Sequence, residues 1–478
     1  MSKSITKNYI YNLSYQILTL ITPFITIPYL SRVLGPDGIG EYSFTFSIVT
    51  YFVLVANLGV ANYAQREIAY HQDDDYVLSR IFFEVNVLRF VLVGASMVVY
   101  YFLVSSWHVS HTIYWLQALN IVAVLFDISW FFQGLEEFGK IVFRNFLVRI
   151  ANVVLIFVLI HEPADLLAYT ALMGAMNIIS GVLIWFYVPQ YVHKVPVKEW
   201  KPFRNFSVIL QLFLPQIAIQ IYIVMDKTLL GVLAGSYAEN AYYEQADKIV
   251  KLLLTIATSL GTVMLPRISY AYAHGLKEDV ERYMMRSYRF TWFLTIPMCL
   301  GLMAVAPSFV PWFFGPGYEP VTTVLQVISG IIIAIGLSNV TGIQYLIPTN
   351  RQNELTLSVT MGAIFNLCMN LYMIPRYQAV GVALATLLTE WLVTIVQFYM
   401  VRHDLHLKRI LSISRMYWLV GIIMFIMVYA IGQYARPTFF YTIIISSVGG
   451  IVYFIGLLAL KDNLIYAVLN KARSKLHI

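Results

Sequence analysis

The stretch Ile221–Gly235, "IYIVMDKTLLGVLAG", indicates what kind of protein this sequence encodes. Apolar residues flank Asp226 and Lys227 on both sides, within a mainly apolar run at 207–233. A membrane-spanning helix needs about 20 such residues, because a helix rises 1.5 Å per residue through roughly 30 Å of hydrocarbon. Charges inside such a run are costly unless they face protein or water. The stretch therefore predicts a membrane helix with a charged side chain turned toward a polar interior.

The whole sequence has the composition of a protein that crosses the membrane many times. Of its 478 residues, 59% are hydrophobic and 12% are charged, whereas soluble domains carry about 25% charged residues. We therefore predict an all-α polytopic membrane protein with about fourteen transmembrane helices. The predicted spans lie near residues 10–31, 40–62, 82–104, 112–133, 146–161, 166–188, 207–233, 241–265, 287–309, 320–346, 355–374, 380–400, 416–434 and 438–460.

Basic residues predict the orientation of these spans. With both termini in the cytoplasm, the cytoplasmic segments would carry roughly 24 Lys and Arg against three on the other side, which matches the bias of membrane proteins. This distribution places Lys140 and Arg144 in a cytoplasmic loop before the fifth span. It also explains the net charge of +7 without a nucleic-acid partner.

Faint internal echoes favour two equivalent halves. Gly35 precedes Tyr42 by seven residues, just as Gly235 precedes Tyr242. Parallel repeats of this kind are found in transporters, with the substrate site between the halves. We predict two six-helix bundles, followed by two additional helices and a cytoplasmic tail, at residues 1–206, 207–412 and 413–478.

The predicted eighth span carries a row of charges. Glu244, Asp247, Lys248 and Lys251 follow the spacing i, i+3, i+4, i+7, which places all four on one face of a helix. Such a row cannot face lipid. Together with Asp226 of the preceding span, it predicts one wall of a hydrated cavity that handles substrate or ions. The alternative is a static ion pair in which Asp226 binds Lys248 or Lys251 and locks two helices together.

Other charges lie in or beside the remaining spans. Arg89 and Arg149 are either cations that face the cavity or interfacial side chains that reach toward water. Asp127 falls in the fourth span, Arg66 closes the second, and Glu390 lies near the middle of the twelfth. A cationic lumen would attract phosphate, and isolated carboxylates suit proton or sodium coupling. For Glu390, a satisfied hydrogen bond to a neighbouring helix is the alternative. No cofactor is expected beyond an ion gradient.

Three stretches resemble the Wzx-type polysaccharide transporter family. They are "SYQILTLITPFITIPYLSRVLGPDGIGEYSFTFSIVTYFVLVANLGVANYAQREIA", "IYIVMDKTLLGVLAGSYAENAYYEQADKI" and "NLCMNLYMIPRYQAVGVALATLLTE". In the third, Asn366, Asn370, Pro375, Gly381 and Thr386 stand where that family places them. The resemblance implies fourteen helices in two bundles, as in the multidrug/oligosaccharidyl-lipid/polysaccharide exporter superfamily, within a bacterial plasma membrane.

The resemblance also implies a function. Such proteins flip an undecaprenyl-diphosphate-linked sugar repeat unit from the cytoplasmic to the outer leaflet, for export of capsule, O-antigen or exopolysaccharide. A polymerase and glycosyltransferases of the same pathway would be partners. By position, the resemblance carries over Arg32 and Arg66 from the first motif, and Asp226 with Lys248 from the second, as site residues.

Two other functions compete with this one. A drug exporter of the same superfamily usually has twelve spans and one or two cavity carboxylates, so the many cations argue against it. A membrane-embedded polymerase would need a large outer loop or a metal site, and "DDD" at 73–75 is better interpreted as a solvated loop. The sequence has no GxxxxGK[ST] phosphate loop. We therefore expect neither ATP hydrolysis nor any other enzymatic activity.

Overall fold

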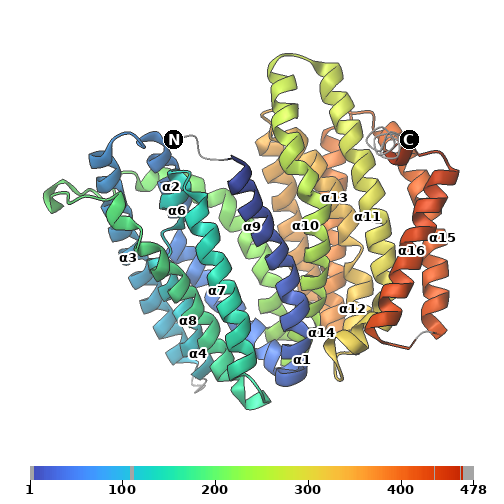
Figure 1. Cartoon of the computed structure of the whole chain (residues 1–478), viewed down its shortest axis with the longest axis horizontal. Helices are drawn as coiled ribbons and strands as arrows, with labels where there is room; N and C mark the ends of the chain where they lie inside the picture. The colour runs from blue at the N-terminus through green and yellow to red at the C-terminus, as the bar shows by residue number, and fades with distance from the viewer. Residues whose placement is uncertain (1–4, 108–111, 435, 463, 467–478) are drawn as a thin grey trace. The chain divides into compact units, whose positions relative to one another are not determined.

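The computed structural model describes residues 5–107, 112–434, 436–462 and 464–466, and every regular element in these ranges is a helix. The chain divides into two compact units (Figure 1). The first comprises Met1–Gly231 and Ser236–Asn240, and the second comprises Val232–Gly235 and Ala241–Ile478. The assignment of residues 1–206, 207–412 and 413–478 to two repeated bundles and an added pair stays a prediction.

The first unit is built from helices α1 to α9. They are α1 (Ile5–Asn57), α2 (Val60–Tyr70), α3 (Asp75–Ser106), α4 (Thr112–Gln117), α5 (Leu119–Phe126), α6 (Ser129–Gly134), α7 (Phe138–Leu159), α8 (Leu166–Trp185) and most of α9 (Phe206–Leu233).

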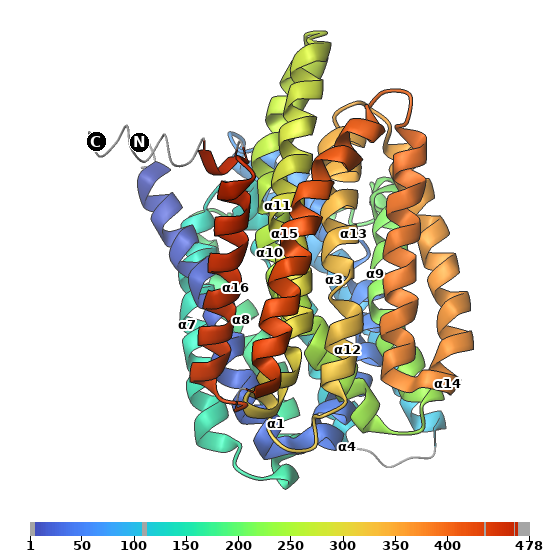
Figure 2. The ribbon, with the colours of Figure 1, turned by 90° about the vertical axis from the view of Figure 1, so that its right-hand side faces the viewer.

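The second unit contains the remaining helices. They are α10 (Tyr237–Ala273), α11 (Lys277–Phe314), α12 (Val321–Ile328), α13 (Ile331–Ser338), α14 (Gln352–Met400), α15 (Leu407–Tyr434) and α16 (Phe439–Ala459), with a π-helical stretch at Asn339–Leu346 after α13. The hairpin of α10 and α11 extends beyond the ends of α13 and α14 (Figure 2). It reverses at Gly275, which has a left-handed φ of 70°.

The described helices account for the fourteen predicted spans. Eleven helical segments in this part of the chain are long and apolar enough to cross a membrane. Two of them are pairs of helices joined at a kink, at Gly35 in α1 and at Gln378 in α14. Counting both members of each pair and adding α9 gives fourteen. Gly35 has φ 68° and is followed by Pro36, which has no N–H to continue the helical bonds. The glycine predicted to be its counterpart, Gly235, has φ 71°.

The surface of these helices is apolar, as expected of a protein in lipid. Phe102 on α3, Ile426 on α15 and Ile451 on α16 are more than half exposed, and many large apolar residues beside them are also exposed. Soluble proteins rarely carry contiguous apolar patches of this extent. The chain is therefore a multi-pass membrane protein.

Several predicted spans differ from the observed helices, three of them in the first unit. The second span stops at Asn57 rather than 62, because Leu58 and Gly59 are both left-handed and α2 starts anew at Val60. The fourth span is three short helices, with Asp127 in extended backbone between α5 and α6. The fifth begins at Phe138, eight residues before the predicted position at 146.

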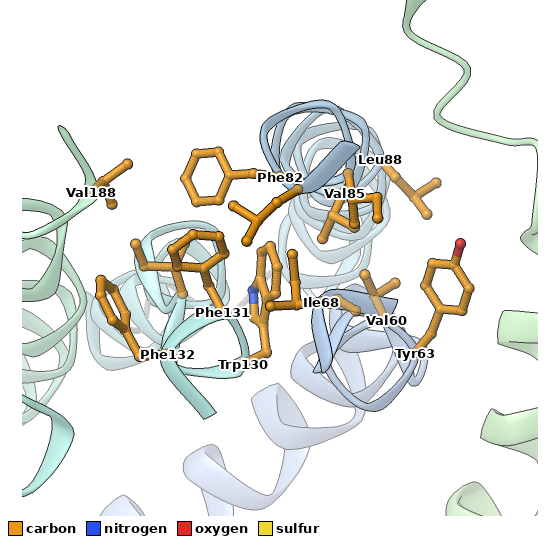
Figure 3. Packing of buried hydrophobic residues seen from close by; sticks show 14 of the residues in the cluster. Val60, Tyr63, Ile68, Phe82, Val85, Leu88, Trp130, Phe131, Phe132 and Val188 are labelled. Atoms are coloured by element: carbon orange, nitrogen blue, oxygen red, sulfur yellow. The ribbon is translucent and has the colours of Figure 1, made fainter. Parts of the chain in front are cut away.

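A buried aromatic cluster fixes this region of the first unit. Phe82 from α3, Ile68 from α2 and Trp130 from α6 converge in it (Figure 3), and the ring centroids of Phe82 and Trp130 are 5.9 Å apart. Such packing holds α6 against α2 and α3. It therefore also fixes the turn at Asp127, immediately before α6.

Candidate functional site

A polar cavity lies inside the first unit, within a bundle whose outer surface is apolar. Its volume is about 320 Å³, and it is bounded by α1, α3, α5, α7 and α8. We call it the first-unit cavity. Its polar lining includes Arg89, Asn120, Asp127, Arg144 and Asn177.

Arg89 is built into the wall of this cavity. Its side chain is 1% exposed, and its guanidinium donates hydrogen bonds to the carbonyl oxygens of Val124 and Asp127. These carbonyls lie at the C-terminal end of α5, where helical carbonyls lack partners within the helix and favour a cation. Arg89 therefore joins α3 to the end of α5 and brings a positive charge to the cavity edge.

Asp127 and Arg144 form the charged pair of the cavity. Arg144 Nη1 lies 3.8 Å from Asp127 Oδ1, and Arg144 Nη2 donates to Ser129 Oγ at 3.1 Å. Ser129 in turn donates its backbone N–H to Asp127 Oδ1 at 3.1 Å. The side chain of Asp127 is 56% exposed, whereas that of Arg144 is 8% exposed. With Arg89, the lining holds two guanidinium groups and one carboxylate, so its formal charge is positive.

Arg144 was not among the predicted site residues, because the predicted fifth span began after it and left it in a cytoplasmic loop. Helix α7 begins at Phe138, so Arg144 lies almost two turns inside a helix. The apolar residues at Phe138, Ile141 and Phe143 were the available signal for an earlier helix start.

A chain of side-chain amides lines the same region. Asn177 Nδ2 donates to Asn120 Oδ1 at 2.9 Å, Asn120 Nδ2 to Gln117 Oε1 at 2.9 Å, and Gln117 Nε2 to Thr45 Oγ1 at 3.2 Å. The chain joins α8, α5, α4 and α1. Hydrogen bonds of this kind hold membrane helices together. No single position of the sequence indicated it, because its members belong to four different helices.

The other predicted cations of the first unit do not line this cavity. Arg66 lies 3.2 Å from Glu67 Oε1, with its guanidinium 5.9 Å from the ring centroids of Tyr63 and Tyr70. Arg149 is half-buried and donates to the carbonyl of Thr19 at 3.5 Å. Arg32 is exposed and donates to the carbonyl of Pro28 at 2.7 Å. The predicted carboxylate Asp226 is also not in the cavity lining; it lies on α9 and is 3% exposed.

The charged row predicted for the eighth span lies on α10. Lys248 Nζ is 2.9 Å from Glu244 Oε1, and Lys251 Nζ is 2.7 Å from Asp247 Oδ2. The lysine side chains are 42% and 51% exposed, whereas those of the two acids are 13% and 6% exposed. Both ion pairs therefore join residues of one helix. A pair between Asp226 and either lysine, and a chamber between the two halves, stay predictions.

The structure also describes Glu390 and the "DDD" stretch at 73–75. Glu390 on α14 is half-buried, and its carbonyl accepts a hydrogen bond from Thr394 Oγ1 at 2.9 Å. In the "DDD" stretch, Asp74 caps α3 by accepting from the backbone N–H groups of Tyr76 and Val77. This is a common role for Asp before a helix.

Solved structures of similar fold are membrane transporters. A lipid II flippase MurJ in an inward closed conformation superimposes with a TM-score of 0.73 at 17% identity, covering 96% of this chain and all of that one. An inward-facing multidrug resistance MATE family transporter gives a TM-score of 0.64 at 14% identity, covering 82% of this chain and 96% of that one. At these identities the likeness concerns the fold.

Relatives in sequence extend over most of the chain. A protein of Escherichia coli (strain K12) named "Putative O-antigen transporter" is 24% identical over 406 residues, or 84% of this chain and 97% of that protein. The lipid II flippase MurJ of Bacillus subtilis (strain 168) is 20% identical over 444 residues, or 81% of this chain and 80% of that protein. The polysaccharide biosynthesis protein family matches residues 5–271, more than half of the chain. The chain belongs to this family.

Proposed function

We propose that the chain is a flippase for a lipid-linked oligosaccharide. It would carry an undecaprenyl-diphosphate-linked repeat unit from the cytoplasmic to the outer leaflet of a bacterial plasma membrane, by alternating access and with both termini in the cytoplasm. The relatives named as an O-antigen transporter and as lipid II flippases support this proposal. Translocation makes and breaks no covalent bond, so no enzymatic step is part of it.

The observation that carries the proposal is the chemistry of the first-unit cavity. Arg89 and Arg144 outnumber the single carboxylate of Asp127 there, and guanidinium groups match phosphate oxygens in charge and geometry. The amides of Asn120 and Asn177 are of the kind that bind sugar hydroxyls, since an amide both donates and accepts. A site with both features suits a substrate in which diphosphate and sugar are adjacent.

The predicted site residues take two roles in this proposal. The cations Arg32, Arg66, Arg89, Arg149, Lys248 and Lys251 would attract and guide the diphosphate. The carboxylates Asp127, Asp226, Glu244, Asp247 and Glu390 would respond to a proton or sodium gradient, because burial and nearby cations shift the affinity of a carboxylate for protons. The polyprenyl tail is too long to be enclosed and would remain in lipid.

A second function, ion-coupled drug export, is favoured by the fold shared with a MATE family transporter and by the buried Asp226. A lipophilic cation would prefer a cavity with excess negative charge. The positive charge of the first-unit cavity therefore weighs against it.

The test is a flipping assay with the full chain in proteoliposomes, supplied with a lipid-linked oligosaccharide on one side. Arg144→Ala should slow flipping strongly. Asp127→Asn should reduce the increase in flipping rate that an imposed ion gradient produces. Arg376→Ala is the matched control, since this exposed arginine stacks on Tyr372 with its guanidinium 3.9 Å from the ring centroid. Efflux of a cationic dye without flipping would favour the exporter instead.

A further inference from the structure

The second unit contains a larger cavity that the proposed function does not use. It has a volume of about 800 Å³ and lies between the C-terminal part of α10, the N-terminal part of α11 and the start of α15, with Leu464 at one side. This volume is in the usual range for ligand sites, roughly 300–1,000 Å³. We call it the arginine groove.

Five arginines line the arginine groove: Arg267, Arg282, Arg286, Arg289 and Arg409. Three of them, Arg282, Arg286 and Arg289, follow the spacing i, i+4, i+7 on α11 and so share one face of that helix. The lining also holds two acids, Glu278 and Glu281. The groove is therefore strongly positive.

Four of the five arginines form no ion pair with a described residue. Arg282 is paired with Asp279 at 2.5 Å, and Glu281 is 3.0 Å from His406 Nδ1. Within the part of the chain that the structure describes, no ion pair engages Arg267, Arg286, Arg289 or Arg409. The stretches outside that part contain no Asp or Glu.

Apart from Tyr283 and Ser287, the rest of the described lining is apolar. Leu260, Met264, Phe290 and Ile413 lie beside the arginines, and none of the described lining residues carries a side-chain amide. Neighbouring residues of α15 expose apolar side chains, among them Leu411 at 49%. These apolar side chains would add no binding free energy for a soluble anion. An amphiphile with an anionic head would bury its first methylene groups against them and so bind more tightly.

We propose that the arginine groove binds the phosphate headgroup of an ordinary anionic glycerophospholipid, such as phosphatidylglycerol, from the cytoplasmic leaflet. Basic pockets between membrane helices on that side recognise anionic lipid heads, and the leaflet supplies them in excess. The described lining of the groove has arginines and apolar residues in place of the amides of the first-unit cavity, so it fits a glycerol phosphate better than an oligosaccharide. The proposal concerns a resident lipid and is separate from the transported one.

The main test measures lipid binding to the purified full chain in neutral detergent. Phosphatidylglycerol, phosphatidylcholine, undecaprenyl diphosphate and inorganic diphosphate are added singly, and bound lipid is counted by native mass spectrometry. We expect phosphatidylglycerol to bind at least about tenfold more tightly than phosphatidylcholine, the equivalent of one charge-assisted hydrogen bond. The triple variant R286Q/R289Q/R409Q should lose this preference. The matched control K194Q/K198Q/K201Q removes three other cytoplasmic-side charges and should keep it.

Three results would overturn the proposal. One is unchanged phosphatidylglycerol binding by the triple variant. Another is an equal loss in the control variant, which would mean attraction by net charge alone. The third is tighter binding of undecaprenyl diphosphate or inorganic diphosphate at the same arginines, which would make the groove a substrate or phosphate site.

A second measurement uses the unmodified sequence, so it does not depend on the fold of any variant. A photoactivatable phosphatidylglycerol should crosslink to peptides containing residues 282–290 or 409–413. Crosslinks spread evenly over all membrane helices would contradict a defined site. Lipid binding is measured without the oligosaccharide lipid. The outcome of the flipping assay therefore does not affect the interpretation of the binding result.

Discussion

The first-unit cavity and the arginine groove both contain several arginines, yet the protein treats these arginines differently. In the cavity, Arg89 and Arg144 are 1% and 8% exposed and are bound to helix carbonyls, Ser129 and Asp127. In the groove, Arg267, Arg286 and Arg409 are exposed and have no carboxylate partner in the described ranges. The fold therefore uses the guanidinium of Arg89 to hold α3 against α5, whereas the groove arginines are available to a ligand. Arg144 is intermediate, because protein groups hold it and it also lines the cavity.

The difference follows from the cost of burying charge. A guanidinium removed from water must regain its hydrogen bonds within the protein, or the fold is destabilised by several kcal/mol. An arginine at the membrane surface keeps its water and needs no built-in partner. The comparison therefore predicts that substitution of Arg89 mainly lowers stability, whereas substitution of the groove arginines mainly weakens ligand binding.

The largest effect is expected from Arg89→Ala. The substitution leaves the carbonyls of Val124 and Asp127 without their donor and opens a void between α3 and α5. We expect a loss of about 3 kcal/mol in the free energy of unfolding, measured by SDS titration of the purified protein. Arg402→Ala, at an exposed arginine, is the control and should change stability by less than about 0.5 kcal/mol. Equal stabilities would mean that Arg89 is not part of the architecture.

Arg144→Ala should mainly affect transport. It removes one charge-assisted contact to a phosphate, so flipping should fall by about 10- to 100-fold in proteoliposomes. Arg144→Lys keeps the charge and should retain part of the rate, because lysine lacks the forked geometry of arginine. If the lysine variant is as slow as the alanine variant while both fold, charge is not what Arg144 contributes.

A smaller effect is expected for the ion pairs of α10, whose side chains are intermediate in exposure between those of the cavity and those of the groove. Asp247 is buried, whereas Lys251 is half-exposed at 51%. A double-mutant cycle with Asp247→Asn and Lys251→Gln should give a coupling energy of about 0.3–0.5 kcal/mol, typical of pairs four residues apart on a helix. A coupling above about 2 kcal/mol would mean that the pair is locked in a dry environment.

The smallest effect on stability is expected in the arginine groove. In detergent without added lipid, Arg286→Gln and Arg409→Gln should each change the free energy of unfolding by less than about 0.5 kcal/mol. Thermal unfolding with and without phosphatidylglycerol would then show stabilisation of the wild-type chain only. Destabilisation by more than about 1 kcal/mol without lipid would identify a structural partner for these arginines and weaken the contrast with the cavity.

The residues that defined the site differ in how far the sequence could reveal them. The row from Glu244 to Lys251 was readable because helical spacing is local. Arg89 was recognised as a candidate, but its carbonyl acceptors lie 35 and 38 residues away along the chain. Arg144 was missed because hydropathy does not register the first turns of a helix that begins with mixed residues. The break at Asp127 was missed because the whole span is apolar on average.

The sequence by itself determined the all-helical class, the fourteen spans and the charged face of α10. These depend on apolar length and on the period of one helix, and both are properties of neighbouring residues. Only the tertiary structure decided which arginines are bound to the protein and which remain open. That distinction depends on carbonyls, carboxylates and apolar residues brought together from distant helices, because a buried charge is tolerated only where such partners meet it.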